Sequence, residues 1–380
     1  MPIRERRTLR FAYGFDDIAI VPGDITINPE QTDIGFELGK LHFSSPILAA
    51  AMDGVVDVNL AIAFSKLGGL AVLNLEGLQT RYDDPDEILA QIAAAPQSEV
   101  TALLQKVYSA PIRENLIGER VKAIKDGGGV CAVSVTPALT KKLYKTAVEA
   151  GMDVLVVQST VTTTRHVSKS TQGLVFSELR KLVSVPIIVG NCVSYNVAKG
   201  LMETGVTAVL VGVGPGAACT TREVLGVGVP QVTATMDCAA ARDDYFRETK
   251  RYVPIIADGG IRAGGDLCKA FACGADAVML GSILVQTAEA PGRGSHWGMA
   301  TSHGALPRGT RVRVPQNSTL QKTLLGPATV TDGTQNLLGA LRTCMGVCGA
   351  GNIKDMHKVE IVIAPTIKTE GKQLQRLQAQ

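Results

Sequence analysis

The chain has 380 residues, of which 46% are hydrophobic and 4% aromatic, and its formal net charge is +3. This charge is too even to indicate nucleic-acid binding, and no uncharged apolar stretch reaches the roughly 18 residues that span a membrane. Residues 1–10 are basic and lack the apolar segment of an export signal, so we expect a cytoplasmic protein. The eight cysteines show no disulfide-scaffold spacing and are expected to be reduced thiols.

One pattern recurs along the chain: an amphipathic helix, a glycine suited to a left-handed helix cap, and a short apolar strand. Four such units are expected, with further apolar strands between them. The predicted helices cover residues 58–67, 139–150, 196–204 and 266–273, and the strands cover 46–50, 70–73, 130–135, 152–157, 185–189, 206–211, 253–257 and 275–280.

Eight apolar strands joined by helices predict a parallel sheet that is buried on both faces. A doubly wound open sheet is one alternative, but the G-x-G-x-x-G turn expected after its first strand is missing. Instead, Asp258-Gly259-Gly260 follows the seventh strand and Gly281-Ser282 the eighth, where barrels commonly bind phosphate. We therefore predict an α/β fold of the (β/α)8 TIM-barrel type.

Three stretches fall outside this repeat. Residues 83–128 indicate a helical insert of one long or two short helices, and the polar residues 299–325 indicate a short active-site flap. Residues 366–380 are rich in Lys and Gln and are expected to form a mobile C-terminal tail. The remainder, residues 1–365, is interpreted as a single catalytic barrel domain.

The loop after the sixth strand, residues 212–223, carries the strongest candidate for chemistry. Its glycines allow backbone groups to approach a ligand closely. Thr220 and Glu223 fit a capping box, which would place Cys219 just before a helix. The helix N-terminus and Arg222 would lower the pKa of the Cys219 thiol and make it a nucleophile. The alternative is an inert buried cysteine in a tight turn.

Two further strand ends suit a phosphorylated ligand. The glycines after Asp258 can offer amides to a phosphate, and the carboxylate can accept hydrogen bonds from a diol. An ordinary strand-to-loop turn is the alternative. Gly281-Ser282 is a weaker signal by itself, and it gains weight from its pairing with the loop after the seventh strand.

The run Gly-Pro-Gly-x-x-Cys-Thr-Thr (214–221), followed by Gly-Val-Gly-Val-Pro-Gln (226–231), resembles the active-site loop of the IMP dehydrogenase/GMP reductase family. Further segments match that family in the same order along nearly the whole chain. They are Phe15–Ile18, Ala50–Asp53, Gly190-Asn191, Ala257–Arg262, Met279–Ser282, Glu289–Gly292, Gly298-Met299 and Leu341-Arg342.

The resemblance implies that Cys219 attacks C2 of a purine and that Thr221 handles a proton beside it. It also implies that Asp258 holds the ribose and that the backbone of Gly298 and Met299 reads the base. The other implied positions are Met52, Asn191, Gly216, Gly260, Gly281 and Ser282 for the nucleotide, Gln158, Ser159, Gly212 and Gly214 for the nicotinamide cofactor, and the carbonyls of Gly214, Gly216 and Cys219 for a monovalent cation such as potassium.

The chain departs from the family at several positions. Ala217 stands where the family usually has serine, and Gln158 where it has an aspartate directed at the nicotinamide. No tyrosine lies between Gly298 and Leu325, so the Arg-Tyr pair with which the dehydrogenases activate water is missing. Arg308 and Arg311 are candidate replacements, with solvated flap arginines as the alternative.

The leading hypothesis is an NAD-dependent IMP dehydrogenase of guanine nucleotide biosynthesis, which oxidises IMP to XMP through a covalent thioimidate. An NADPH-dependent GMP reductase is the alternative, favoured by the short flap and the missing Arg-Tyr pair. A purine-nucleotide-binding barrel without turnover is a second alternative, disfavoured by the intact Cys219. The region after Tyr82 is too short for tandem CBS domains. The resemblance implies a homotetramer or homo-octamer, and neither nucleic acid nor membrane is an expected partner.

Overall fold

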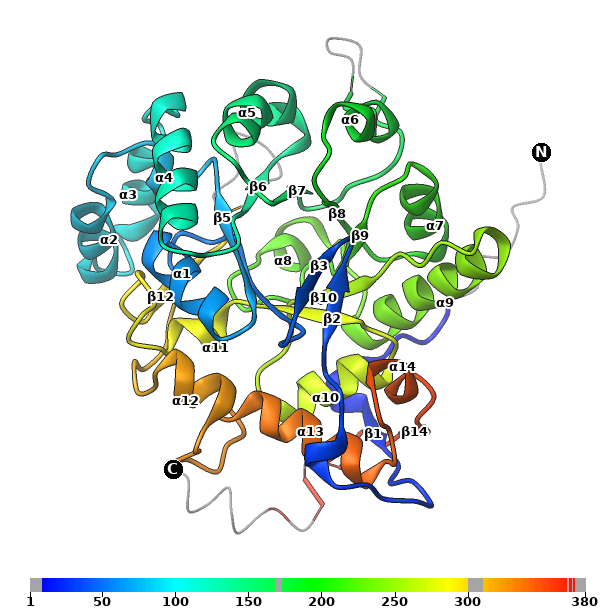
Figure 1. The fold of residues 1–380 in the computed structure, drawn as a ribbon. Helices are drawn as coiled ribbons and strands as arrows, with labels where there is room; N and C mark the ends of the chain where they lie inside the picture. The colour runs from blue at the N-terminus through cyan, green and yellow to red at the C-terminus, as the bar shows by residue number, and fades with distance from the viewer. Residues whose placement is uncertain (1–8, 168–172, 300–309, 368, 371, 373–380) are drawn as a thin grey trace, which may run out of the picture.

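Eight parallel strands close into a barrel in the order β4-β5-β6-β7-β8-β9-β10-β11, with helices around them (Figure 1). The computed structural model describes residues 9–367 apart from 168–172 and 300–309, and also residues 369, 370 and 372. The last strand pairs with the first, since Met279 lies opposite Leu48. This closure confirms the predicted TIM barrel, and the doubly wound alternative is wrong.

All eight predicted barrel strands are present, and successive side chains serve two different cores. Leu48 and Val72 point into the barrel interior, whereas their neighbours Ile47 and Leu73 pack against the helices. Burial on both faces explains why the strands are apolar throughout. The strands are β4 (Ile47–Ala49), β5 (Leu70–Asn74), β6 (Ala132–Val135), β7 (Val154–Gln158), β8 (Ile187–Cys192), β9 (Ala208–Val211), β10 (Ile255–Asp258) and β11 (Ala277–Leu280).

The four predicted helix–glycine–strand units are also confirmed. Gly68, Gly151, Gly205 and Gly274 end their helices with φ of 81°, 92°, 91° and 102°, a region in which glycine is favoured. No helix among the described residues is both long and apolar enough to cross a membrane. The helices around the barrel are α1 (Val58–Lys66), α4 (Glu114–Asp126), α5 (Pro137–Glu149), α6 (Phe176–Leu182), α7 (Tyr195–Glu203), α9 (Gln231–Thr249), α10 (Gly264–Ala272), α11 (Ser282–Val285), α12 (Leu320–Leu325) and α13 (Leu337–Val347).

A hairpin of β2 (Phe36–Leu38) and β3 (Leu41–Phe43) covers the end of the barrel at which the strands begin (Figure 1). Phe36, Leu38 and Phe43 belong to the interior core of the barrel. The two ends of the described chain meet beside α10, because β1 pairs with β14. The elements there are η1 (Phe15–Asp17), β1 (Ile18–Ile20), η2 (Pro29–Gln31), α14 (Ile353–Met356) and β14 (Ile361–Ile363).

The predicted insert, residues 83–128, contains three helices rather than one or two. Only α2 (Pro85–Ala94) and α3 (Val100–Val107) are additions to the barrel, since α4 packs between α1 and α5 as a barrel helix. Pro96 and Pro111 lie in the two breaks, where proline disfavours a continuous helix. Between β5 and β6 the chain forms only these helices and η3 (Leu78–Thr80), with no CBS domain.

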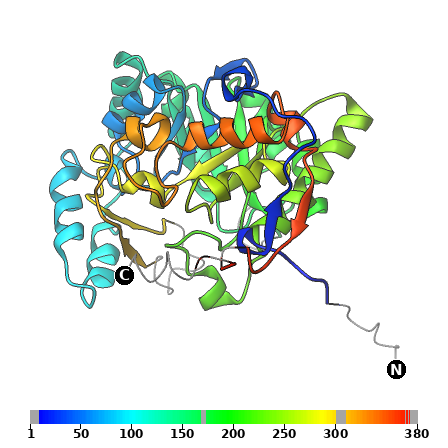
Figure 2. The same ribbon diagram turned by 90° about the horizontal axis from the view of Figure 1, so that it is seen from below.

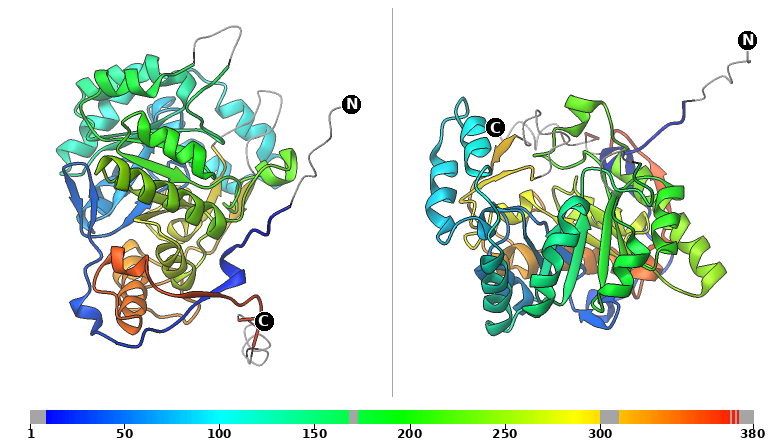
Figure 3. Two further views of the ribbon diagram at one scale, coloured as in Figure 1. Left: turned by 90° about the vertical axis from the view of Figure 1, so that its right-hand side faces the viewer. Right: turned by 90° about the horizontal axis from the view of Figure 1, so that it is seen from above.

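The second half of the predicted flap is packed structure. β12 (Ser295–Trp297) pairs with β13 (Arg311–Arg313), and α12 buries Leu320 and Leu324 in the core around the barrel. The β12–β13 pair lies beside α2 and α3 (Figures 2 and 3). The predicted tail, residues 366–380, lies mostly outside the described residues.

Candidate active site

A cavity of about 1070 Å³ opens at the carboxyl ends of the barrel strands. The carboxyl end of each of the eight strands, or the loop after it, contributes to the lining, as expected for the ligand-binding end of a barrel. The structure thus brings together fifteen of the seventeen predicted site residues, which are Met52, Gln158, Ser159, Asn191, Gly212, Gly214, Gly216, Cys219, Thr221, Asp258, Gly260, Gly281, Ser282, Gly298 and Met299.

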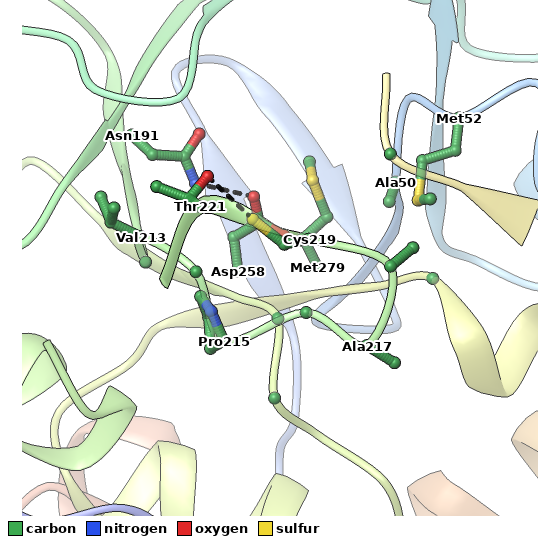
Figure 4. A pocket seen from close by; sticks show the side chains of 18 of the residues that line it. Ala50, Met52, Asn191, Val213, Pro215, Ala217, Cys219, Thr221, Asp258 and Met279 are labelled. Carbon is green, nitrogen blue, oxygen red and sulfur yellow. Dashed lines mark hydrogen bonds between the residues drawn. The ribbon is translucent and has the colours of Figure 1, made fainter. Parts of the chain in front are cut away.

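Cys219 lies two residues before the short helix α8 (Thr221–Leu225) and lines the cavity. Its thiol donates a hydrogen bond to Oγ1 of Thr221, with the two atoms 3.1 Å apart (Figure 4). The predicted capping box is wrong. Thr220 has φ −106° and ψ 7° instead of extended backbone, so its side chain does not cap the helix.

Glycines allow the Cys219 loop to lie flat against the end of β10. A Cβ on Gly212, which has a φ of 149°, would stand 2.2 Å from the carbonyl oxygen of Asp258. A Cβ on Gly259, whose φ is 89°, would stand 3.0 Å from Cγ of Pro215. Larger residues at either position would therefore separate Cys219 from the Asp258-Gly259-Gly260 turn.

Asp258 ends β10 and is directed at Asn191, which follows the central residues of β8. Nδ2 of Asn191 donates a hydrogen bond to Oδ2 of Asp258 over 2.8 Å (Figure 4). Burial raises the pKa of the Asp258 carboxyl to about 6, and the hydrogen bond from Asn191 opposes that rise. Above that pH the carboxylate is ionised and can accept hydrogen bonds from a diol.

The opposite side of the cavity is formed by the ends of β4 and β11 together with β12. A Cβ on Gly281 would be 3.2 Å from Sδ of Met52, so this glycine allows the two loops to meet. His296 lines the same side, and neither ring nitrogen has a partner among the described residues. Burial lowers the pKa of His296 to about 4, which leaves the ring neutral near pH 7.

Buried hydrogen bonds support the segment that is expected to read a purine base. Nε1 of Trp297 donates to the hydroxyl of Tyr108 over 2.8 Å, and that hydroxyl donates to Asp53 over 2.5 Å. Sδ of Met299 lies 3.4 Å from the same hydroxyl. Tyr108 was not among the predicted site residues, because no local signal relates α3 to residues almost 200 positions later.

The side of the cavity at the carboxyl ends of β5, β6 and β7 is lined by uncharged polar residues and by one carboxylate, Glu76. Glu76 was also not among the predicted site residues. The backbone N–H of Thr136 donates to Oε1 of Glu76 over 2.6 Å. Oε1 of Gln158 is buried without a partner among the described residues. An unsatisfied acceptor of this kind fits a ligand that carries hydroxyl or amide donors, such as a nicotinamide cofactor.

The two arginines predicted to activate water are not placed at Cys219 by the described structure. Arg311 does not line the cavity. It is buried against the insert, where its Nη1 donates to the carbonyl oxygens of Ile92 and Ala95 over 2.6 and 2.7 Å. Arg308 lies outside the described residues.

The predicted cation ligands share one loop, and all are backbone carbonyls, which suit potassium. The carbonyl oxygen of Gly216 accepts the N–H of Cys219 over 3.0 Å, and its second lone pair is available to a cation. No group of three His, Cys, Asp or Glu side chains in the described part of the chain is arranged to hold a metal ion. All eight cysteines are free thiols.

Residues 12–371 match the family described as the IMP dehydrogenase / GMP reductase domain. The chain belongs to this family. An uncharacterized oxidoreductase from Mycolicibacterium smegmatis is 39% identical over 94% of this chain and 98% of its own length. An inosine-5′-monophosphate dehydrogenase from Methanocaldococcus jannaschii is 29% identical over 94% of each chain.

A crystal structure of an IMP dehydrogenase/GMP reductase-like protein from Corynebacterium glutamicum has the same fold. It superposes with a TM-score of 0.90 at 35% identity and covers 96% of this chain and 97% of its own. These similarities confirm the resemblance seen in the sequence and identify an oxidoreductase family. They do not distinguish between the dehydrogenase and reductase reactions of the family, so that distinction rests on the chemistry of the site.

Proposed function

We propose that the protein is an NAD-dependent IMP dehydrogenase, which converts IMP, NAD+ and water into XMP, NADH and a proton. One observation carries the proposal: the Cys219 thiol, hydrogen-bonded to Thr221, lies in one cavity with the Asp258 carboxylate and the glycine-containing turns after β10 and β11. A thiol nucleophile, a diol acceptor and a phosphate cradle are together what covalent chemistry on a nucleotide requires.

The cavity walls would hold the nucleotide at three points. Asp258, supported by Asn191, would accept hydrogen bonds from the ribose hydroxyls. Gly260, Gly281 and the hydroxyl of Ser282 would bind the 5′-phosphate, because backbone amides approach an anion most closely where no Cβ intervenes. The backbone of Gly298 and Met299 would contact the base, with Met52 and Gly216 beside it.

In the reaction the sulfur of Cys219, in its thiolate form, bonds to C2 of the purine, and the electron pair of the C2–H bond departs as hydride. A nicotinamide cofactor held by Gln158, Ser159, Gly212 and Gly214 would supply the acceptor for that hydride. Water then adds to C2, the C–S bond breaks with its electron pair returning to sulfur, and a proton is released. The Thr221 hydroxyl, 3.1 Å from the sulfur, is positioned to hold or move a proton at this carbon.

The charges of the cavity support NAD rather than NADPH. Its described arginines are both engaged: Arg262 pairs with Asp16 over 2.7 Å, and Arg222 donates to the carbonyl of Val229 over 2.9 Å. No lysine lines the described cavity, so it offers no unengaged Lys or Arg to a 2′-phosphate. Gln158, Ser159, Gly212 and Gly214 are the cofactor-binding positions of this proposal.

The proposal has further parts. A monovalent cation would be held by the carbonyls of Gly214, Gly216 and Cys219, and Arg308 is the flap residue assigned to water activation. We also propose a cytoplasmic homotetramer or homo-octamer that acts in guanine nucleotide synthesis.

A paired kinetic assay tests the reaction. The protein is incubated with IMP and NAD+, or with GMP and NADPH, and the absorbance of the reduced nicotinamide is followed. We expect the absorbance to increase in the first mixture with the wild-type protein and to stay constant with the Cys219→Ala variant. A decrease in the second mixture alone would identify a GMP reductase, and no change in either would leave a nucleotide-binding barrel without turnover.

A further inference from the structure

We propose that Glu76 binds a ribose of the nicotinamide cofactor by accepting hydrogen bonds from its two vicinal hydroxyls. The inference rests on the proposed function and adds a specific ligand group to it. Glu76 lines the cavity two residues beyond the end of β5, on the side of the barrel that also holds Gln158.

The Glu76 side chain is held in place by the barrel itself. Its backbone N–H donates to Oδ1 of Asn74 over 2.9 Å, and its Oε1 accepts the N–H of Thr136 over 2.6 Å. Asn74 ends β5 and Thr136 follows β6, so one strand positions the Glu76 backbone and the residue after the adjacent strand orients its carboxylate. The other oxygen, Oε2, has no hydrogen-bond partner among the described residues and is available to a ligand.

The residues around Glu76 suit a ligand that carries hydrogen-bond donors better than one that carries a positive charge. Ser134, Thr136, Gln158 and Ser159 line this side, and all are uncharged. Oε1 of Gln158 is a buried acceptor that also has no described partner. A pair of ribose hydroxyls supplies two donors at adjacent carbons, and a carboxylate can accept hydrogen bonds from both.

Each of the two nucleotides in the reaction carries a ribose diol, and the described lining of the cavity has two carboxylates without an arginine partner. Asp258 ends β10, three places from β5 in the barrel order, and lies beside Cys219 with the glycine cradle. The third lining carboxylate, Asp16, pairs with Arg262. Glu76 is therefore the carboxylate that remains for the second nucleotide, and β7 presents the neutral Gln158 in place of an acid.

Isothermal calorimetry tests this assignment in a protein that cannot turn over, because the Cys219→Ala substitution removes the nucleophile. The full-length Cys219→Ala protein is saturated with IMP and titrated with NAD+, and the Cys219→Ala/Glu76→Gln double variant is titrated in the same way. The glutamine keeps an oxygen for the N–H of Thr136 but loses the charge. We expect the Kd for NAD+ to rise at least about tenfold, with the Kd for IMP and the Tm unchanged. Glu223→Gln, an exposed position of α8 outside the cavity lining, is the matched control.

A parallel titration with NADP+ identifies the ribose. Equal losses for NAD+ and NADP+ indicate the nicotinamide ribose, whereas a loss for NAD+ with a gain for NADP+ indicates the adenosine ribose, whose 2′-phosphate the carboxylate would repel. Unchanged NAD+ affinity in Glu76→Gln would overturn the inference and leave the proposed function standing. If the Cys219→Ala parent itself binds no NAD+, both the assignment of Glu76 and the proposed NAD-dependent function would be overturned.

Discussion

The amide of Asn191 and the carboxylate of Asp258 are joined by a 2.8 Å hydrogen bond across the carboxyl ends of β8 and β10. β9, whose loop carries Cys219, lies between these two strands. The bond therefore spans the base of the nucleophile loop, and it orients the carboxylate that we assign to the ribose. The protonation state of Asp258 then bears directly on nucleotide binding.

We predict that affinity for IMP decreases as the pH is lowered through about 6. Burial raises the pKa of Asp258 to about 6, so below that pH the carboxyl is protonated and no longer a double acceptor. Kd values measured by calorimetry between about pH 5 and pH 8 check this. The phosphate of IMP itself titrates near 6, so Asp258→Asn is the control. A pH profile that is the same in wild type and variant would contradict the prediction.

Thr221→Val is expected to lower kcat by about 100-fold or more, because it removes the hydroxyl bonded to the Cys219 thiol while keeping the shape of the side chain. Steady-state kinetics with IMP and NAD+ measure this effect, and calorimetry should show an IMP Kd within about threefold of wild type. Thr221→Ser retains the hydroxyl and should keep most activity. Equal kcat values for the serine and valine variants would remove Thr221 from the proton-handling step.

Arg311→Ala is expected to act on stability rather than on chemistry. The substitution removes the donor to the carbonyl of Ile92 and leaves the carbonyl of Ala95 with only the 3.2 Å hydrogen bond from Arg313, at a cost of about 2–3 kcal/mol in the free energy of unfolding. Denaturant unfolding measures the loss, and quenched reactions should show no build-up of the covalent nucleotide. Normal stability with an accumulated covalent intermediate would instead show that Arg311 activates water.

At the opposite end of the barrel, Arg242→Met is expected to destabilise the protein by about 3–5 kcal/mol. The buried guanidinium donates to Asp276 over 2.9 Å and to the carbonyl of Gly274 over 2.6 Å, so its loss leaves a buried charge unpaired. Arg247→Met, which removes an exposed ion pair with Asp244, should cost less than about 0.5 kcal/mol. Comparable losses in the two variants would be evidence against a special role for the buried pair.

Much of the barrel could be predicted because its signals are local. An apolar strand buried on both faces and a glycine with positive φ, as at Gly151 and Gly205, are properties of a few consecutive residues. The insert was less predictable, since the breaks near Pro96 and Pro111 divide it into three helices of which only two are additions. Whether a helix joins the barrel ring, as α4 does, depends on contacts such as those with α1, which precedes it in the sequence by β5 and both added helices.

The candidate site was predictable to the extent that its residues follow strand ends. Gln158 and Asp258 are the last residues of β7 and β10, and Cys219 lies in the glycine-rich loop after β9, so all three reach the cavity. Arg311, which was predicted from its charge alone, instead donates to a carbonyl some 220 positions earlier. Glu76 was overlooked because its sequence neighbours Leu75 and Gly77 do not indicate that its side chain turns into the cavity. Its orientation comes from the N–H of Thr136, a contact that no local pattern indicates.

Trp297 is the single tryptophan of the chain, and it is fully buried one residue before Gly298. Its indole N–H donates a hydrogen bond to the hydroxyl of Tyr108, and that hydroxyl also contacts the sulfur of Met299. The intrinsic tryptophan fluorescence of this protein therefore originates from one ring at the edge of the cavity. Emission wavelength and quenching become a label-free optical reporter of ligand occupancy there, with no engineered probe and no background from other indoles.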